Sequence, residues 1–123
     1  MENEELYPVP VETAAKIDRL TRMERYKMRR SADIPNIKDA IGETLTPIAE
    51  MLNEYTDGDG EVHKVLVIKS ADGRYFRTEV AAFIDNYRDY ITEFGDEAER
   101  PNILITGKKS KRGNPYINFD IVE

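Results

Sequence analysis

Cationic side chains accompany a tyrosine in two short segments of the chain, a combination that can bind a phosphate backbone and stack on a base. The first segment lies between residues 69 and 77 and contains Lys69, Arg74, Tyr75 and Arg77. The second lies between residues 108 and 116 and contains Lys108, Lys109, Lys111, Arg112 and Tyr116. Proteins that bind single strands combine a cationic groove with aromatic side chains, and each stacked base contributes about 1–3 kcal/mol. These residues are therefore the candidate contacts to a nucleic acid.

A β-hairpin is the element expected to position the first segment. The Val- and Ile-rich run 62–70 predicts one strand, and residues 74–78 predict the returning strand. Between them, residues 71–73 predict a three-residue turn with Gly73 in the left-handed conformation. That register places Val67, Lys69, Tyr75 and Arg77 on one face, and Leu66, Ile68 and Phe76 on the core face. A slip of one residue would reverse the two faces.

The pattern after this hairpin predicts an amphipathic helix and a second pair of strands. The helix begins after Thr78 and ends at Gly95, with an apolar stripe on one side and acidic residues on the other. Strands are predicted over 102–107 and 116–122, joined by a basic turn.

Residues 37–56 fit two secondary structures. Their apolar residues match a helical stripe, but Gly42 and Pro47 would both fall inside the helix. A proline there clashes with the carbonyl four residues before it. The other interpretation is a long, bent strand from about Thr44 to Thr56, with Pro47 near its edge or at a bulge. The fold depends on this choice.

With a strand at 44–56, the order of three strands, a helix and two strands is that of the OB-fold, a Greek-key barrel. We therefore predict a mainly β protein: a five-stranded OB-fold barrel over residues 37–123, preceded by an acidic arm and a basic helix within residues 1–36. In the OB-fold the ligand lies across the second and third strands, beside the loop that joins the last two. The candidate contacts lie there. If 37–55 is helical instead, the chain is an α+β protein-interaction or regulatory module that does not bind nucleic acid.

The stretch 42–122 also resembles small single-stranded-DNA-binding proteins encoded by phages and conjugative elements of Gram-positive bacteria. The resemblance is carried above all by residues 105–117, with the run Lys108-Lys109-Ser110-Lys111-Arg112. It implies an OB-fold, binding without catalysis, and a role in DNA replication, recombination or transfer of the element. The chain departs from such proteins because it contains no tryptophan.

The net charge of −6 is unevenly distributed along the chain. Residues 16–30 contain seven basic and two acidic residues, whereas residues 108–112 contain four basic residues and no acidic one. These segments carry local charges of +5 and +4, so the remainder sums to −15. A cationic binding surface can therefore coexist with an acidic protein.

The sequence offers no catalytic centre, metal site or cofactor site. Cysteine is absent, His63 is the only histidine, and no serine lies in a Gly-x-Ser-x-Gly turn. No apolar run approaches the ~18–20 residues of a membrane span. We expect a cytoplasmic, non-enzymatic protein that needs no metal or cofactor and whose partner is single-stranded DNA. The same surface would also accept RNA, and a homodimer is compatible with exposed strand edges.

Overall fold

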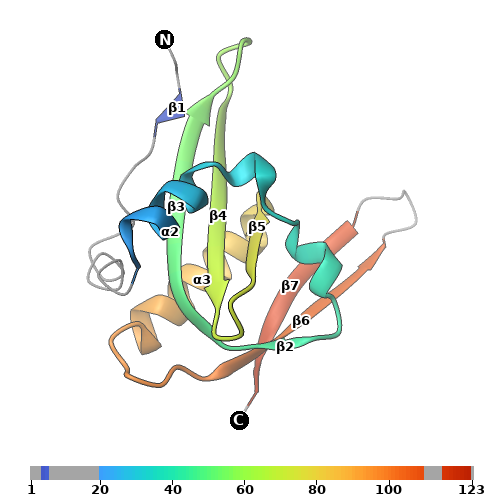
Figure 1. Ribbon diagram of the computed structural model, residues 1–123. Helices are drawn as coiled ribbons and strands as arrows, with labels where there is room; N and C mark the ends of the chain where they lie inside the picture. Colours follow the sequence, from blue (N-terminus) through green and yellow to red (C-terminus); the bar gives the residue numbers. More distant parts are fainter. Residues whose placement is uncertain (1–3, 6–19, 110–114, 123) are drawn as a thin grey trace.

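Two antiparallel sheets and two α-helices form the part of the chain that the computed structural model describes, residues 4–5, 20–109 and 115–122 (Figure 1). The first sheet contains, in sheet order, β1 (Glu4–Glu5), β3 (Pro47–Thr56), β4 (Val62–Ser70) and β5 (Tyr75–Thr78). The second contains β2 (Thr44–Leu45), β6 (Asn102–Lys109) and β7 (Pro115–Val122). The helices are α2 (Arg22–Arg29) and α3 (Ala81–Phe94), with 3₁₀ turns η2 (Ser31–Asp33) and η3 (Ile37–Ala40). None of the described helices combines the length and apolar composition needed to cross a membrane.

The β4–β5 hairpin forms in the predicted register. Lys69 pairs with Tyr75, and Val67 pairs with Arg77. Gly73 closes the turn at a φ of 94°, a left-handed conformation that glycine adopts without steric cost. Its N–H donates to the carbonyl of Ser70 at 2.9 Å. The turn residues and the alternation of the strands therefore determine this register together.

The segment that fitted two secondary structures is extended from Thr44 onward. It forms β2 in one sheet, passes Thr46, and continues as β3 in the other sheet. The register shifts between Pro47 and Ala49, where the proline has no N–H to donate. The bent strand with a bulge is confirmed, and the helical interpretation of 37–55 is wrong, together with the architecture built on it.

The predicted five-stranded OB-fold barrel is wrong. The described strands form separate sheets of four and three strands, and neither sheet closes into a barrel. β5 is only four residues long, and the chain before η3 occupies its outer edge. Arg77 N–H donates to the carbonyl of Pro35 at 2.9 Å, and Asn36 forms a parallel bridge with Arg77. A barrel would need this edge free to pair with another strand.

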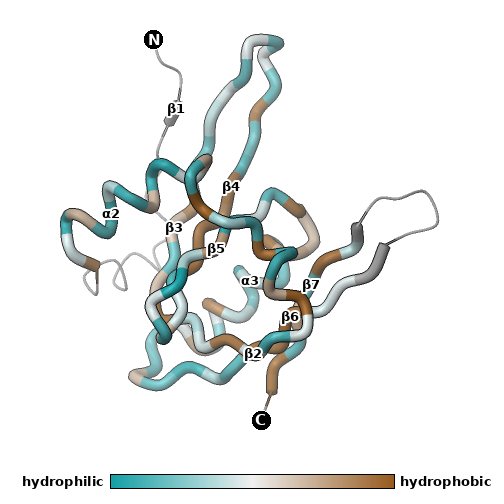
Figure 2. The backbone as a smooth tube through the Cα atoms, turned by 45° about the vertical axis from the view of Figure 1, so that its right-hand side comes forward, coloured by the Kyte–Doolittle hydropathy of each residue, from teal (hydrophilic) through white to brown (hydrophobic). Residues whose placement is uncertain are grey.

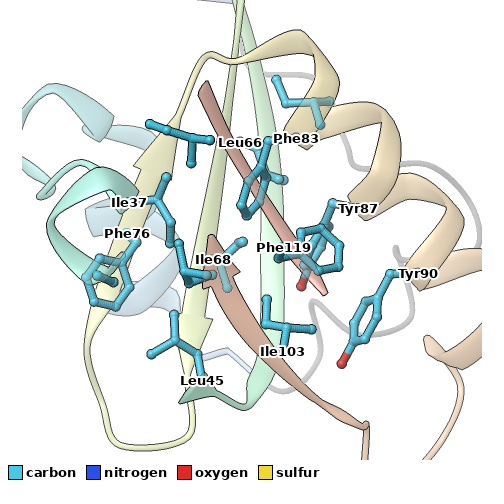
Figure 3. Packing of buried hydrophobic residues seen from close by; sticks show 14 of the residues in the cluster. Ile37, Leu45, Leu66, Ile68, Phe76, Phe83, Tyr87, Tyr90, Ile103 and Phe119 are labelled. Atoms are coloured by element: carbon cyan, nitrogen blue, oxygen red, sulfur yellow. The ribbon is translucent and has the colours of Figure 1, made fainter. Parts of the chain in front are cut away.

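The main hydrophobic core is built by side chains from both sheets and α3 (Figure 3). The sheets contribute residues that alternate along the strands and face inward, among them Leu66, Ile68, Phe76, Ile103 and Phe119. From α3, the rings of Phe83 and Tyr87 pack against that of Phe119, with ring centres 5.0 and 6.0 Å away. The predicted core face of the β4–β5 hairpin is therefore confirmed.

A second, smaller core lies on the opposite face of the first sheet, under α2. Met28 of α2 is fully buried there against side chains of β3 and β4, including Ala49, Met51, Val65 and Val67. The described part of the predicted basic helix is α2, while residues 11–19 lie outside the described residues. Rather than preceding the strands as a separate segment, this part of the chain forms an outer layer on the sheet (Figure 1).

Candidate nucleic-acid interface

α2 is an amphipathic helix whose polar face is cationic. It begins at a capping box, in which Glu24 N–H donates to Thr21 Oγ1 at 3.1 Å and Thr21 N–H donates to Glu24 Oε1 at 2.8 Å. Met28 faces the sheet, while Met23 and Tyr26 are 72% and 57% exposed. The exposed cations of the helix and its end are Arg22, Lys27, Arg29 and Arg30. Figure 2 shows α2 as a mostly hydrophilic segment on the outside of the strands.

The predicted contacts Lys69 and Tyr75 lie beneath α2, not on an open face. The Lys69 ammonium and the Tyr75 hydroxyl both donate to Glu24 Oε2, the latter at 3.1 Å. Lys27 Nζ lies 4.7 Å from the centre of the Tyr75 ring. The hydrogen bond from Lys69, with that from Thr21, lowers the pKa of Glu24 to about 2. Lys69 and Tyr75 are half-buried, so this face of the hairpin is not the open binding surface that the OB-fold prediction requires.

The two predicted arginines of this hairpin have different surroundings. Arg74 is exposed, and its guanidinium binds the carboxylates of Glu43 at 2.7 Å and Asp72 at 2.9 Å. Arg77 is half-buried, and its Nε–H donates to the carbonyl of Ile34 at 2.8 Å. Arg77 also lines a groove beside α2. Arg77 is therefore the better placed of the two to meet an anionic ligand.

This groove has a volume of about 560 Å³ and lies between the end of α2 and the first sheet. Its charged and aromatic lining consists of Arg29, Arg30, Arg77, Asp33, Glu79 and Tyr55. Arg30 Nε lies 3.5 Å from Asp33, and the Tyr55 ring stacks on His63 with centres 4.9 Å apart. The groove therefore has more cations than carboxylates, with an aromatic ring beside them. This arrangement suits the phosphate and the base of a nucleotide. The sequence did not reveal this groove because four separate segments of the chain line it.

The end of the β6–β7 hairpin presents the other predicted tyrosine. Tyr116 is 52% exposed and pairs with Lys108 across the ladder. Ile41, which is 42% exposed, packs closely on Gly107: a Cβ added there would lie 2.7 Å from Ile41 Cδ1. The apolar side chain of Ile41 therefore lies beside Gly107. Gly107 pairs with Ile117, the residue that follows Tyr116. Lys109 is on β6 at this end, whereas Lys111 and Arg112 lie outside the described residues.

The basic side chains differ in whether a carboxylate neutralises them. Lys69 binds Glu24, and the buried Arg100 binds a carboxylate at 2.5 Å. Among residues 20–109 and 115–122, no carboxylate lies within salt-bridge distance of Arg22, Lys27 or Arg29. These α2 cations are exposed and form no ion pair with the described residues.

Potential metal ligands meet at the β3–β4 loop, where Asp57, Glu61 and His63 bring one ligand atom each within 4.8 Å of the others. Asp57 Oδ2 lies 2.8 Å from His63 Nε2, and Asp57 Oδ1 accepts the N–H groups of Asp59 and Glu61 at 2.8 and 3.0 Å. The hydrogen bond to Asp57 raises the pKa of His63. We assign this cluster the structural role of closing the loop.

A buried ionic group joins α3 to β3. Arg100 Nη1 lies 2.5 Å from Glu50 Oε1, which also accepts the Tyr87 hydroxyl at 2.7 Å. Burial raises the pKa of Tyr87 well above its usual range. Because the side chains of Glu50 and Arg100 are only 2% and 1% exposed, this group is closed to a ligand and serves the fold.

Comparisons with protein-family models, with curated proteins and with solved structures return no match. The resemblance carried by residues 105–117 therefore stays a prediction.

Sequence reasoning missed Tyr26 and Tyr55 as candidate contacts. The cations of residues 16–30 were recognised, but not the position of their helix on the sheet. The available signal was Met28, an apolar residue within the cationic run, which indicates that one side of the helix is buried.

Proposed function

We propose that this protein binds single-stranded DNA without catalysing a reaction and largely without regard to sequence. The proposed interface has three parts: the outer side of α2 (Arg22, Tyr26, Lys27 and Arg29, called here the α2 face), the groove lined by Arg77, and the Tyr116 end of the β6–β7 hairpin. Following the resemblance, we place this activity in the replication, recombination or transfer of a mobile element. We place it in the cytoplasm, because a chain without cysteine suits a reducing compartment.

The observation that carries the proposal is the α2 face itself. Its cations have no carboxylate partner in the described part of the chain, and they surround a tyrosine that is 57% exposed. Arg25 lies three positions after Arg22 and four positions before Arg29 on α2. Like charges at these spacings on a helix repel each other, so this arrangement opposes folding. An anionic partner removes that repulsion. A phosphate backbone supplies the charge, and an unpaired base supplies a surface for the ring.

Aromatic exposure favours single strands over duplex as the ligand. Tyr26 and Tyr116 can stack on bases only where those bases are not already stacked in a duplex. Stacking does not read base identity, which supports weak sequence preference. α2 has the sequence RMERYKMR and thus lacks the Asn and Gln side chains that commonly read adenine in the major groove.

The chain itself connects the parts of the proposed interface. In both Figure 1 and Figure 2, the segment with η2 and η3 runs from α2 toward the β6–β7 hairpin. Its end is fixed there, because Gly42 N–H donates to the carbonyl of Ile105 at 2.8 Å. Lys38 is exposed along this segment. A bound strand that follows it would leave the α2 face and reach Tyr116 last.

The test is a fluorescence anisotropy titration with a labelled oligothymidine of about 30 nucleotides, longer than a typical single-domain site. It is run at low and moderate salt, with unlabelled duplex DNA and single-stranded RNA as competitors. Binding at micromolar or lower concentration that weakens with salt and resists the duplex supports the proposal. Absence of binding at low salt contradicts it, and preferential displacement by RNA reassigns the ligand to RNA.

A further inference from the structure

Glu24 is an internal anion bound by two side chains that would suit an external one. Its Oε2 atom accepts from both the Lys69 ammonium and the Tyr75 hydroxyl. We propose that Lys69 and Tyr75 form a phosphate-binding site, which the Glu24 carboxylate fills in the free protein and a phosphate of single-stranded DNA takes over on binding. This inference rests on the function proposed above, and it adds a covered site that becomes available only in competition with Glu24.

A phosphate oxygen can take the place of Glu24 Oε2 while the hydrogen bond that caps α2 is kept. Glu24 Oε2 holds the two donors of the site, whereas Oε1 accepts Thr21 N–H at 2.8 Å. The Glu24 side chain can therefore turn away from Lys69 and still cap α2. Phosphate and carboxylate oxygens accept charge-assisted hydrogen bonds from the same kinds of donor.

The Tyr75 ring, which would stack on a base in the covered site, is also occupied by another side chain of the free protein. Lys27 Nζ lies 4.7 Å from the centre of the Tyr75 ring, so an internal cation lies over the ring. Lys27 belongs to the α2 face and is exposed. When Lys27 moves to a phosphate, the Tyr75 ring gains room for a base.

α2 does not depend on Glu24 alone for its position. Met28 is fully buried in the second core, and Asn53 Nδ2 donates to the carbonyl of Met28 at 3.1 Å. The side chains of Lys69 and Glu24 are 16% and 22% exposed, so solvent reaches their contact at the helix edge. The exchange is therefore local and needs no release of the helix.

The experiment compares Glu24→Gln with Glu54→Gln in the oligothymidine titration. Glutamine keeps the capping acceptor but removes the charge that holds Lys69. Glu54 is the matched control, because its carboxylate lies 3.9 Å from Lys64 and its replacement also frees a lysine. We expect Glu24→Gln to bind about fivefold more tightly than the control, with a salt dependence steeper by about 0.7, the value for one added phosphate contact. In a Lys69→Gln background the gain should vanish.

The covered site would be overturned if Glu24→Gln and Glu54→Gln had equal affinity and equal salt dependence. Binding by the wild type would still uphold the proposed function in that case. Failure of the wild type and of Glu54→Gln to bind any single strand would overturn both. If Glu24→Gln does not unfold cooperatively, the inference is tested instead by an NMR titration of the wild type. Oligothymidine must then shift the side-chain signals of Lys69 and Tyr75. Shifts confined to Tyr26 and Tyr116 would contradict the covered site.

Discussion

The side-chain amide of Asn53 in β3 donates to the main-chain carbonyl of Met28 in α2 at 3.1 Å, and both residues are buried. This bond joins a strand of the first sheet to an earlier helix through two residues that are 25 positions apart. It fixes the orientation of α2, with Met28 inward and Tyr26 outward. The cationic side of the helix is therefore held at the surface by the packing beneath it.

Replacing Met28 with alanine should destabilise the protein by about 2–5 kcal/mol, because it leaves a cavity in the second core. Met23→Ala is the matched control, since Met23 lies on the same helix but is 72% exposed. That substitution should change the free energy of unfolding by no more than about 0.5 kcal/mol. Urea denaturation measures both. Equal stability of the two variants would show that α2 does not pack on the sheet.

Removing two cations from the α2 face should weaken single-strand binding. The variant is Lys27→Gln with Arg29→Gln, and we expect the salt dependence of its affinity to become shallower by about 1.4, or about 0.7 for each lost phosphate contact. The control is Lys64→Gln with Arg88→Gln, which makes the same change in net charge away from α2. Anisotropy titrations at several salt concentrations compare them. An equal loss in both variants would mean that only net charge matters.

Tyr116→Ala should lose the stacking of one base, about 1–3 kcal/mol of binding free energy, which corresponds to roughly 5- to 150-fold in affinity. Tyr116→Phe keeps the ring and should bind like the wild type. Among the described residues, the hydroxyl's one hydrogen bond is long, 3.5 Å from Asn118 Nδ2, so we expect its removal to cost the fold little. If the phenylalanine variant loses as much as the alanine variant, the ring does not stack.

The local part of this structure follows from the sequence, and the long-range part does not. The β4–β5 register was predictable because Gly73 and the alternation around Ile68 act within one hairpin. The covering of Lys69 was not, because its partner Glu24 lies 45 residues away. A half-buried lysine and an exposed lysine fit the same alternation of apolar and polar residues along a strand, so the alternation does not distinguish them.

The barrel prediction failed for a related reason. The strands predicted after residue 61 and the helix between them form, but the single strand predicted over 44–56 is divided between two sheets, and β1 was not predicted. Element order also does not show what bonds to the edge of a strand. Pro35 and Asn36 occupy the edge of β5, through bonds that no periodicity in the sequence indicates. The groove lined by Arg77 was missed because tertiary packing alone brings its lining together.

His63 should titrate above its usual pKa of 6.5, because its protonated ring is hydrogen-bonded to Asp57. A raised pKa in the folded state stabilises the protein below pH 6.5, and this contribution disappears as the pH rises through the raised value. The pKa of Asp57 is lowered from 3.8 by the same bond, so its contribution is lost as the pH falls below that value.

The wild type should therefore exceed His63→Gln in thermal stability most clearly at about pH 5 and least at about pH 8. The difference will be small, since exposed pairs are screened by solvent. As His63 is the only histidine, its ring protons can be followed by NMR without further assignment. A titration midpoint at or below 6.5 would contradict the Asp57 contact.

Photo-crosslinking to a 5-bromodeoxyuridine oligonucleotide, mapped by mass spectrometry, tests the central claim most directly because it reports both binding and its location. We expect crosslinks at Tyr26 and Tyr116, reduced by salt and by unlabelled oligothymidine but not by duplex DNA. Crosslinks only along α3, whose outer side carries Asp85 and Asp89, or none above background, would contradict it.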